Sequence, residues 1–367
     1  MPDLYHHSLK VIQTYQSPGG AYVASPNFAT YRYAWFRDGA FTAYAMDVAG
    51  RHESARRFHD WASRTVLRHA EQAERAIEKA MRGQPLGEDY LHTRYAVDGQ
   101  AGTQDWPNFQ IDGLGTWLWA LAWHLRCTAE PLPSTWKHAV RLVARYLAAL
   151  WALPCYDLWE EHSSYLHSYT LAAIYGGLQA AGELFPEGDW SFSAVADEIK
   201  RFVLRHGVRD GRLSKSIAPP SGTAARSPLL SLVDASLVGV ATPYRLFSPG
   251  DAVVRATVAR IEAELHPPGG GVHRYRSDTY YGGGEWVLLA AWLGWYYTEV
   301  GERERARALL HWVEAQADPR KELPEQVSTH LLAPAYRAGW QARWGPVARP
   351  LLWSHAMYII LCRALGA

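Results

Sequence analysis

The chain has 367 residues, 48% of them hydrophobic and 20% charged, so it is long enough to bury a large core. Lys and Arg (37 together) almost balance Asp and Glu (36), without runs of like charge, which excludes the electrostatic pattern of a nucleic-acid-binding or membrane-surface protein. There is no basic, apolar leader and no stretch of about 18 uninterrupted apolar residues, so we expect a soluble, cytoplasmic protein.

Helical periodicity and the positions of Gly and Pro predict twelve helices. In chain order they cover residues 4–15, 38–49, 52–82, 110–127, 134–152, 163–184, 190–206, 226–240, 250–265, 285–300, 302–316 and 349–366. The segments between them are rich in Gly, Pro and Ser, and no convincing alternating strand occurs. The sequence therefore predicts an all-α protein.

Short and long loops alternate between these helices. Six helical hairpins closed into a ring would suit this pattern, so we predict a toroid, or (α/α)6 barrel, formed by residues 1–367 as one domain. The long loops would gather at one mouth of the ring, where we expect the functional site. The sequence does not indicate an oligomeric state.

Aromatic residues are biased toward those with a polar group: 17 Trp and 21 Tyr stand against 9 Phe. Indole and phenol rings can cover the faces of sugar rings while their N–H and O–H groups bond hydroxyls. The same rings can also fill the core of a large helical protein. Composition alone leaves both interpretations open.

Metal and cofactor signatures are lacking. The three cysteines, Cys127, Cys155 and Cys362, are widely spaced in apolar contexts and are predicted to be reduced core residues. His52 and His59 in "HESARRFH" lack metal-ligand spacing and are interpreted as surface or hydrogen-bonded histidines. The Gly-rich segments do not follow strands, so phosphate binding is not predicted.

Aromatic and charged residues recur together where predicted helices start. The groups are Trp35 with Arg37 and Asp38, Trp106 with Asp112, Arg274 with Asp278 and Trp286, and Trp353 with Ser354 and His355. Each group alone could be an acidic helix cap with an aromatic staple. Their repetition favours a sugar site, because sugars need stacking faces and charged hydrogen bonds together.

Two further segments carry isolated carboxylates. In "YDLWEEHSSYLHSYT", Asp157, Glu160 and Glu161 surround Trp159, and in "LPEQV" a proline precedes Glu325. With "YRYAWFRDGA", "WPNFQIDGLG", "HRYRSDTYYGG" and "PLLWSHA", they resemble, in order, the motifs of the glucoamylase-type catalytic domain of glycoside hydrolase family 15, especially its bacterial members. The resemblance covers nearly the whole chain and also implies an (α/α)6 barrel.

The resemblance implies an exo-acting α-glucoside hydrolase that inverts the anomeric centre, releases β-D-glucose and uses no cofactor or metal. Glu160 matches the general acid and Glu325 the general base, and inversion requires their carboxyls roughly 6.5 to 9.5 Å apart. The expected substrate contacts are Arg37 and Asp38 on the terminal glucose, Glu161, Trp106 and Arg274 near the scissile linkage, Asp112 at the floor, and Trp35, Trp159, Trp286 and Trp353 in the walls.

The local sequence also suggests how the two carboxylates ionise. Trp159 offers Glu160 a low-dielectric neighbour, and Asp157 and Glu161 offer it like charges, so we expect a raised pKa for Glu160. Glu325 has no comparable cluster beside it, which is compatible with a base that stays ionised.

The chain also departs from the family pattern. Glu285 stands where fungal glucoamylases have proline, no aromatic residue follows "PEQV", and neither the N-terminal β-sandwich of many bacterial members nor a starch-binding module is found. We therefore expect small oligosaccharides as substrates, either α-1,4 malto-oligosaccharides or α-1,6 isomaltose.

Three alternatives remain at the sequence level: a trehalase, an (α/α)6 phosphorylase and a non-catalytic sugar-binding or regulatory module. A phosphorylase dispenses with the base, and a binding module has no reason to keep both carboxylates. The presence of Glu160 and Glu325 together favours the hydrolase.

Overall fold

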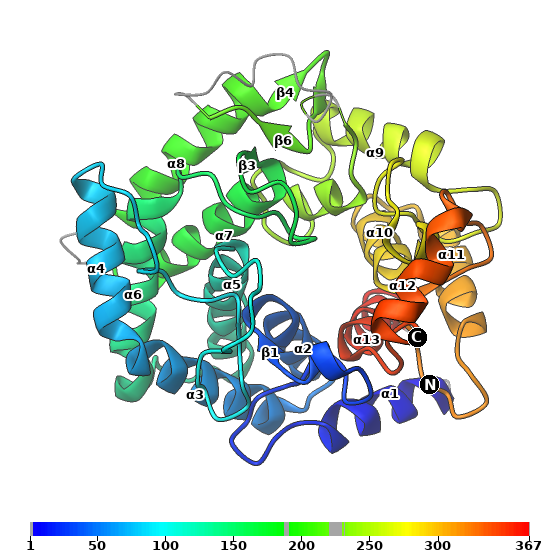
Figure 1. Ribbon diagram of the computed structural model, residues 1–367, viewed down its shortest axis with the longest axis horizontal. Helices are drawn as coiled ribbons and strands as arrows, with labels where there is room; N and C mark the ends of the chain where they lie inside the picture. The colour runs from blue at the N-terminus through cyan, green and yellow to red at the C-terminus, as the bar shows by residue number, and fades with distance from the viewer. Residues whose placement is uncertain (1–2, 187–190, 220–229, 231, 367) are drawn as a thin grey trace.

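The computed structural model describes residues 3–186, 191–219, 230 and 232–366, and in it the helices form two concentric rings (Figure 1). The inner ring runs through α2 (Phe36–Val48), α5 (Asp112–Thr128), α7 (Ser168–Leu184), the 3-10 helix η4 (Ala235–Val240), α10 (Val287–Glu299) and α13 (Leu352–Leu365). Each contacts the next, and α13 packs on α2, so the ring closes. The fold is an (α/α)6 barrel, as predicted.

The outer ring covers the inner one. It comprises α1 (Asp3–Thr14), α3 (His52–Arg68), α6 (Ser134–Leu150), α8 (Phe192–Phe202), α9 (Ala252–Leu265) and α11 (Arg303–Ala315), with α4 (Ala70–Met81) against α6. The two rings differ in how much of each helix is buried. Helix α10 is buried at every position from Val287 to Tyr297, whereas α11 buries only Ala306, Leu309, Leu310 and Val313. A helix that is apolar all round belongs inside, and one with a single apolar stripe belongs outside.

Four two-residue antiparallel ladders pin the loops. They pair β1 (Ala34–Trp35) with β2 (Arg94–Tyr95), β3 (Leu166–His167) with β6 (Ser216–Ile217), β4 (Val208–Arg209) with β5 (Arg212–Leu213), and β7 (Glu285–Trp286) with β8 (Gln326–Val327). Three of them directly precede the inner helices α2, α7 and α10. The loops before these helices are thereby fixed to returning segments from elsewhere in the chain.

Helix α5 crosses α7 at unusually close range, because both helices carry glycine at the crossing. A Cβ on Gly115 would lie 2.4 Å from the carbonyl oxygen of Ala173, and one on Gly177 would lie 2.6 Å from that of Gly115. Both distances are shorter than any real Cβ contact, so the inner ring is this tight only because side chains are absent here.

Most predicted helix bounds are correct to within a few residues, and the errors have physical causes. The helix predicted at 52–82 breaks at His69 into α3 and α4, and the one at 163–184 begins only at Ser168, because residues 166–167 pair as β3. The helix predicted at 190–206 begins at Phe192 and ends at Phe202, where a π-helical turn (Val203–Gly207) follows.

Two other errors concern the loops. Of the helix predicted at 226–240, residues 226–229 and 231 lie outside the described residues, 232–234 are not helical, and 235–240 form only η4. Helix α12 (Arg337–Trp344) was not predicted, because it has only eight residues, none of them fully buried, and its apolar side consists mainly of Trp340 and Trp344.

Within the described residues, no helix has the length and apolarity needed to cross a membrane. The three cysteines are free: Cys155 and Cys362 are buried as predicted, but Cys127 is exposed in the last turn of α5. His59 was also misjudged, because it is buried without a hydrogen bond to either ring nitrogen in the described part of the chain.

We predict that Gly115→Ala lowers the free energy of unfolding by about 1–3 kcal/mol, since the new methyl group must push α7 away. Gly339→Ala in α12 is the matched control, because a Cβ there meets nothing within 4 Å. That control should be neutral or stabilising by up to about 1 kcal/mol. Urea unfolding of both variants measures the difference, and equal stabilities would contradict the close crossing.

Candidate active site

A cavity of about 380 Å³ opens at the mouth where the inner helices begin. Eleven of the twelve residues predicted for the site line it: Trp35, Arg37, Asp38, Trp106, Trp159, Glu160, Glu161, Arg274, Trp286, Glu325 and Trp353. Asp112, the twelfth, is fully buried behind the cavity wall, where its Oδ2 accepts a hydrogen bond from Arg37 at 3.0 Å. It supports the wall without lining it.

Glu160 is held by two donors from other loops. Trp35 Nε1 donates to its Oε1 at 2.8 Å, and Gln110 Nε2 donates to the same oxygen at 3.1 Å. Because both bonds end on Oε1, the second oxygen is the one that can carry a proton. Gln110 also accepts a hydrogen bond from Arg37 at 3.0 Å, so it links Glu160 to the arginine.

The backbone of Glu160 is in the left-handed region, with φ of 69°. Asp157 stabilises this turn: its Oδ1 accepts hydrogen bonds from the amides of Trp159 and Glu161, both at 2.9 Å, and its carbonyl accepts one from the Glu160 amide. Burial opposes ionisation of Asp157, yet the nearby Lys215 ammonium holds its pKa below the ordinary value. The sequence interpretation treated Asp157 as a negative charge without a partner, whereas the structure places it 3.0 Å from the Lys215 ammonium.

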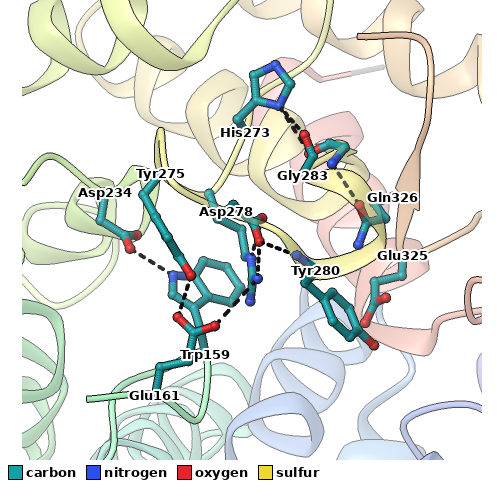
Figure 2. Close-up of polar contacts among 12 residues, drawn as sticks. Trp159, Glu161, Asp234, His273, Tyr275, Asp278, Tyr280, Gly283, Glu325 and Gln326 are labelled. Atoms are coloured by element: carbon teal, nitrogen blue, oxygen red, sulfur yellow. Dashed lines mark hydrogen bonds and ion pairs between the residues drawn. The ribbon is translucent and has the colours of Figure 1, made fainter. Parts of the chain in front are cut away.

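Glu161 follows Glu160 in the chain but has different partners, and its contacts are drawn in Figure 2. The Tyr275 hydroxyl donates to its Oε2 at 2.5 Å, and an Arg274 nitrogen lies 3.7 Å from its Oε1. Arg274 is itself clamped by Asp278 through two hydrogen bonds of 2.7 and 2.5 Å. Its guanidinium lies 5.1 Å from the centre of the Trp286 ring, so the cavity wall here combines charge with aromatic surface.

Glu325 directly precedes β8, and the pairing of β8 with β7 places it opposite Val287, whose amide donates to its carbonyl at 3.2 Å. It is 2% exposed; the Tyr31 hydroxyl donates to its Oε1 at 3.0 Å, and Oε2 has no partner among the described residues. Burial raises the pKa of Glu325 to about 8, although the Tyr31 hydrogen bond and Arg274 oppose the shift. The sequence did not show this burial, so the expectation of an unperturbed base is corrected.

Arg37 and Asp38 are charged residues in a buried part of the cavity wall. The Arg37 guanidinium bonds Gln110 and Asp112, and its Nε lies 3.6 Å from Asp38 Oδ2. Burial raises the pKa of Asp38 to about 6, although the charge of Arg37 opposes the shift. Arg37 Nε and Asp38 Oδ2 are both buried and have no hydrogen-bond partner in the described part of the protein.

Several residues of the site were not found from sequence. Tyr31, which lies at the start of a quoted motif, and Tyr280, whose hydroxyl bonds that of Tyr31 at 2.9 Å, give no signal except their position. Trp340, Arg343 and Trp344 of α12 also line the cavity.

Glu285, which stands where fungal glucoamylases have proline, does not line the cavity. It is fully buried, and its Oε1 accepts a hydrogen bond from the Gly271 amide at 2.6 Å and lies 3.1 Å from a His330 ring nitrogen. Its role is to hold the loop before β7.

A separate polar cluster lies toward the C-terminal ends of the inner helices. Oδ1 of Asp47 is 2.9 Å from Nδ1 of both His52 and His124, and the three could approach a common cation. The hydrogen bonds between Asp47 and the two histidines satisfy these Oδ1 and Nδ1 atoms without a cation. The cluster is remote from the cavity described above and contributes nothing to it.

Comparison with known proteins agrees with this geometry. The family model described as "Glycosyl hydrolases family 15" matches residues 2–330. Isomaltose glucohydrolase of Kribbella flavida is 42% identical over 99% of this chain and 93% of its own length.

Solved structures extend the comparison. A glycosidase solved in complex with glucose is 42% identical and superposes with a TM-score of 0.92, covering 99% of this chain and 96% of that one. A bacterial glucoamylase complexed with acarbose shares the fold, with a TM-score of 0.71 at 18% identity over 99% of this chain and 55% of that one. With two carboxylates facing a cavity of aromatic and charged residues, the chain belongs to glycosyl hydrolase family 15 and is a glycoside hydrolase.

Proposed function

We propose that this enzyme is an exo-acting, anomer-inverting α-glucosidase whose main substrate is the α-1,6-linked disaccharide isomaltose. One observation carries the proposal that the cavity binds a sugar: six buried polar atoms around it have no partner within the described residues. They are Arg37 Nε, Asp38 Oδ2, Glu325 Oε2 and the indole nitrogens of Trp106, Trp286 and Trp353. Buried polar atoms need partners, and the hydroxyls of a sugar enclosed by tryptophans would supply them.

Some residues that line the cavity are buried and others are exposed to solvent, a difference that supports exo action. Arg37 and Trp353 are each 4% exposed, whereas the Glu161 side chain is 32% exposed. The buried end suits the non-reducing terminal glucose, held by Arg37 and Asp38, and the exposed end suits the leaving sugar. Binding at the buried end would fix C1 of the terminal glucose between the two carboxyl groups.

In the proposed mechanism, Glu160 donates its proton to the glycosidic oxygen as the C1–O bond breaks. Glu325 takes a proton from a water on the opposite face of the ring, and the water oxygen forms the new bond to C1, which yields β-glucose. Burial raises the pKa of Glu325, so in its ionised form it binds the proton taken from the water more firmly than an exposed carboxylate would. The unpartnered Oε2 of Glu325 is its free acceptor for this water.

The choice of isomaltose rests on the name of the Kribbella flavida relative, with malto-oligosaccharides and trehalose as the alternatives. A cytoplasmic location is also part of the proposal, supported by three cysteines that are all free.

We predict a higher initial kcat/KM for isomaltose than for maltose, panose or trehalose when free glucose is measured in phosphate-free buffer. The first product seen by proton NMR should be β-glucose. Initial α-glucose would exclude inversion, and a preference for trehalose would identify a trehalase instead.

Glu160→Gln and Glu325→Gln are predicted each to lower kcat by about 10² to 10⁴-fold, since each removes a proton transfer while keeping the shape of the side chain. Glu322→Gln, three residues before Glu325 and outside the cavity lining, is the matched control and should retain activity. Normal turnover in either catalytic variant would refute its assignment.

Burial of Glu325 should also make stability depend on pH. Its folded pKa of about 8 exceeds the ordinary value of 4.5, so its favourable contribution is complete below about pH 4.5 and is lost as the pH rises through 8. Glu325→Gln should therefore gain stability relative to wild type between pH 5 and pH 8, by a few kcal/mol.

Urea unfolding at both pH values measures this gain. Glu78→Gln, at an exposed position of α4, controls for the loss of one negative charge. Parallel pH dependence of wild type and Glu325→Gln would contradict the burial argument.

A further inference from the structure

Lys215 is a buried cation outside the cavity. Its side chain is 4% exposed, and its ammonium lies 3.0 Å from Asp157 Oδ2 and 2.8 Å from Asp234 Oδ2. It also lies 4.0 Å from the centre of the Tyr275 ring. Although burial favours the neutral amine, these two carboxylates raise the pKa of Lys215, so it stays charged. No motif in the sequence marked this residue.

The two carboxylates that Lys215 bridges hold the loop of the proposed acid. Asp157 bonds the amides of Trp159 and Glu161 and closes the turn on which Glu160 lies. Asp234 accepts a hydrogen bond from the Trp159 indole at 2.9 Å (Figure 2). Its other oxygen caps η4 by accepting a hydrogen bond from the Ser236 amide. Lys215 thus ties the loop to the inner ring.

This turn needs external support. A non-glycine residue in the left-handed region, as at Glu160, is unfavourable by about 1 kcal/mol or more and persists only when its surroundings enforce it. Asp157 provides that enforcement, and its own position depends on the cation. Without Lys215, Asp157 and Asp234 would face each other as buried, uncompensated charges, a strongly unfavourable arrangement.

The remaining charges nearby do not replace Lys215. Arg274, whose guanidinium lies 5.4 Å from the Tyr275 ring centre, is engaged by Asp278, and Glu161 adds a further negative charge. Three carboxylates, those of Asp157, Asp234 and Glu161, therefore surround the ammonium and the tyrosine ring.

We propose that Lys215 is a positioning residue for proton donation: through Asp157 and Asp234 it fixes Trp159 and sets the place of the Glu160 carboxyl. The proposal rests on the role of Glu160 as general acid given above. Its consequence is selective, because only substrates whose leaving group needs a proton depend on that position.

Two substrates separate positioning of the acid from a general structural role. When the C1–O bond of isomaltose breaks, the second glucose departs as an alkoxide unless Glu160 protonates the glycosidic oxygen. In α-D-glucosyl fluoride the C1–F bond breaks to release fluoride ion without a proton, and attack by water still uses Glu325. A misplaced Glu160 therefore slows the first reaction and spares the second.

Lys215→Met should lower kcat for isomaltose about 100-fold, the scale of a misplacement of about 1 Å, and leave hydrolysis of glucosyl fluoride within about threefold of wild type. The KM for isomaltose should change much less than kcat, since Arg37 and Asp38 are untouched. Lys79→Met, which removes an ion-paired lysine on α4, is the matched control and should leave both reactions unchanged.

Equal losses on both substrates, or no loss on either, would overturn the proposal for Lys215. If Lys215→Met does not fold, as seen by circular dichroism, the same comparison uses Lys215→Met with Asp234→Asn, which removes one of the two facing charges. Glu160→Gln is measured alongside: if it does not itself spare the fluoride selectively, the acid assignment fails, whatever Lys215→Met does.

Discussion

The inner helices leave no room for chemistry along their length. In α10 every side chain from Val287 to Tyr297 is buried, and where α5 crosses α7 even a methyl group does not fit. A reacting group must then lie at the end of a helix or in a loop. The short ladders before α2, α7 and α10 give these loops a fixed geometry, and this is where the cavity, both candidate carboxylates and the tryptophan walls are found.

Burial then acts differently on each charged group. Asp157 and Asp112 are matched by Lys215 and Arg37, and serve to hold other residues. Among the residues that the structure describes, Glu325 has a hydroxyl donor but forms no ion pair, and its pKa rises to about 8 because of its burial. Carboxylates that look alike in sequence therefore have different roles. Asp157 and Asp112, each paired with a cation, hold the shape of the site, whereas Glu325, which has no such pair among the described residues, has a raised affinity for a proton.

The fold could be predicted well because the periodicity of apolar residues reveals the helices. It also separates inner helices, which are apolar on all sides, from outer helices, which have one apolar face. The lining residues could be found because they belong to contiguous motifs at helix starts. Contacts between distant segments could not be predicted. They include the hydrogen bonds from Gln110 and Trp35 to Glu160, and the ion pair of Lys215 with Asp157. Helix α12, with eight residues and two tryptophans on its cavity side, is too short to give a clear periodic signal. The partner of Asp157, Lys215, lies 58 positions away and was not recognised.

The segment between β8 and α13 connects the proposed base to one wall of the cavity. Glu325 directly precedes β8, and its amide donates a hydrogen bond to the carbonyl of Ala348 at 3.0 Å, shortly before α13 begins at Leu352. Between these two points the segment carries α12, whose Trp340, Arg343 and Trp344 line the cavity. One stretch of chain therefore holds both Glu325 and a wall against which a sugar would lie, so a change in its length would disturb the two together.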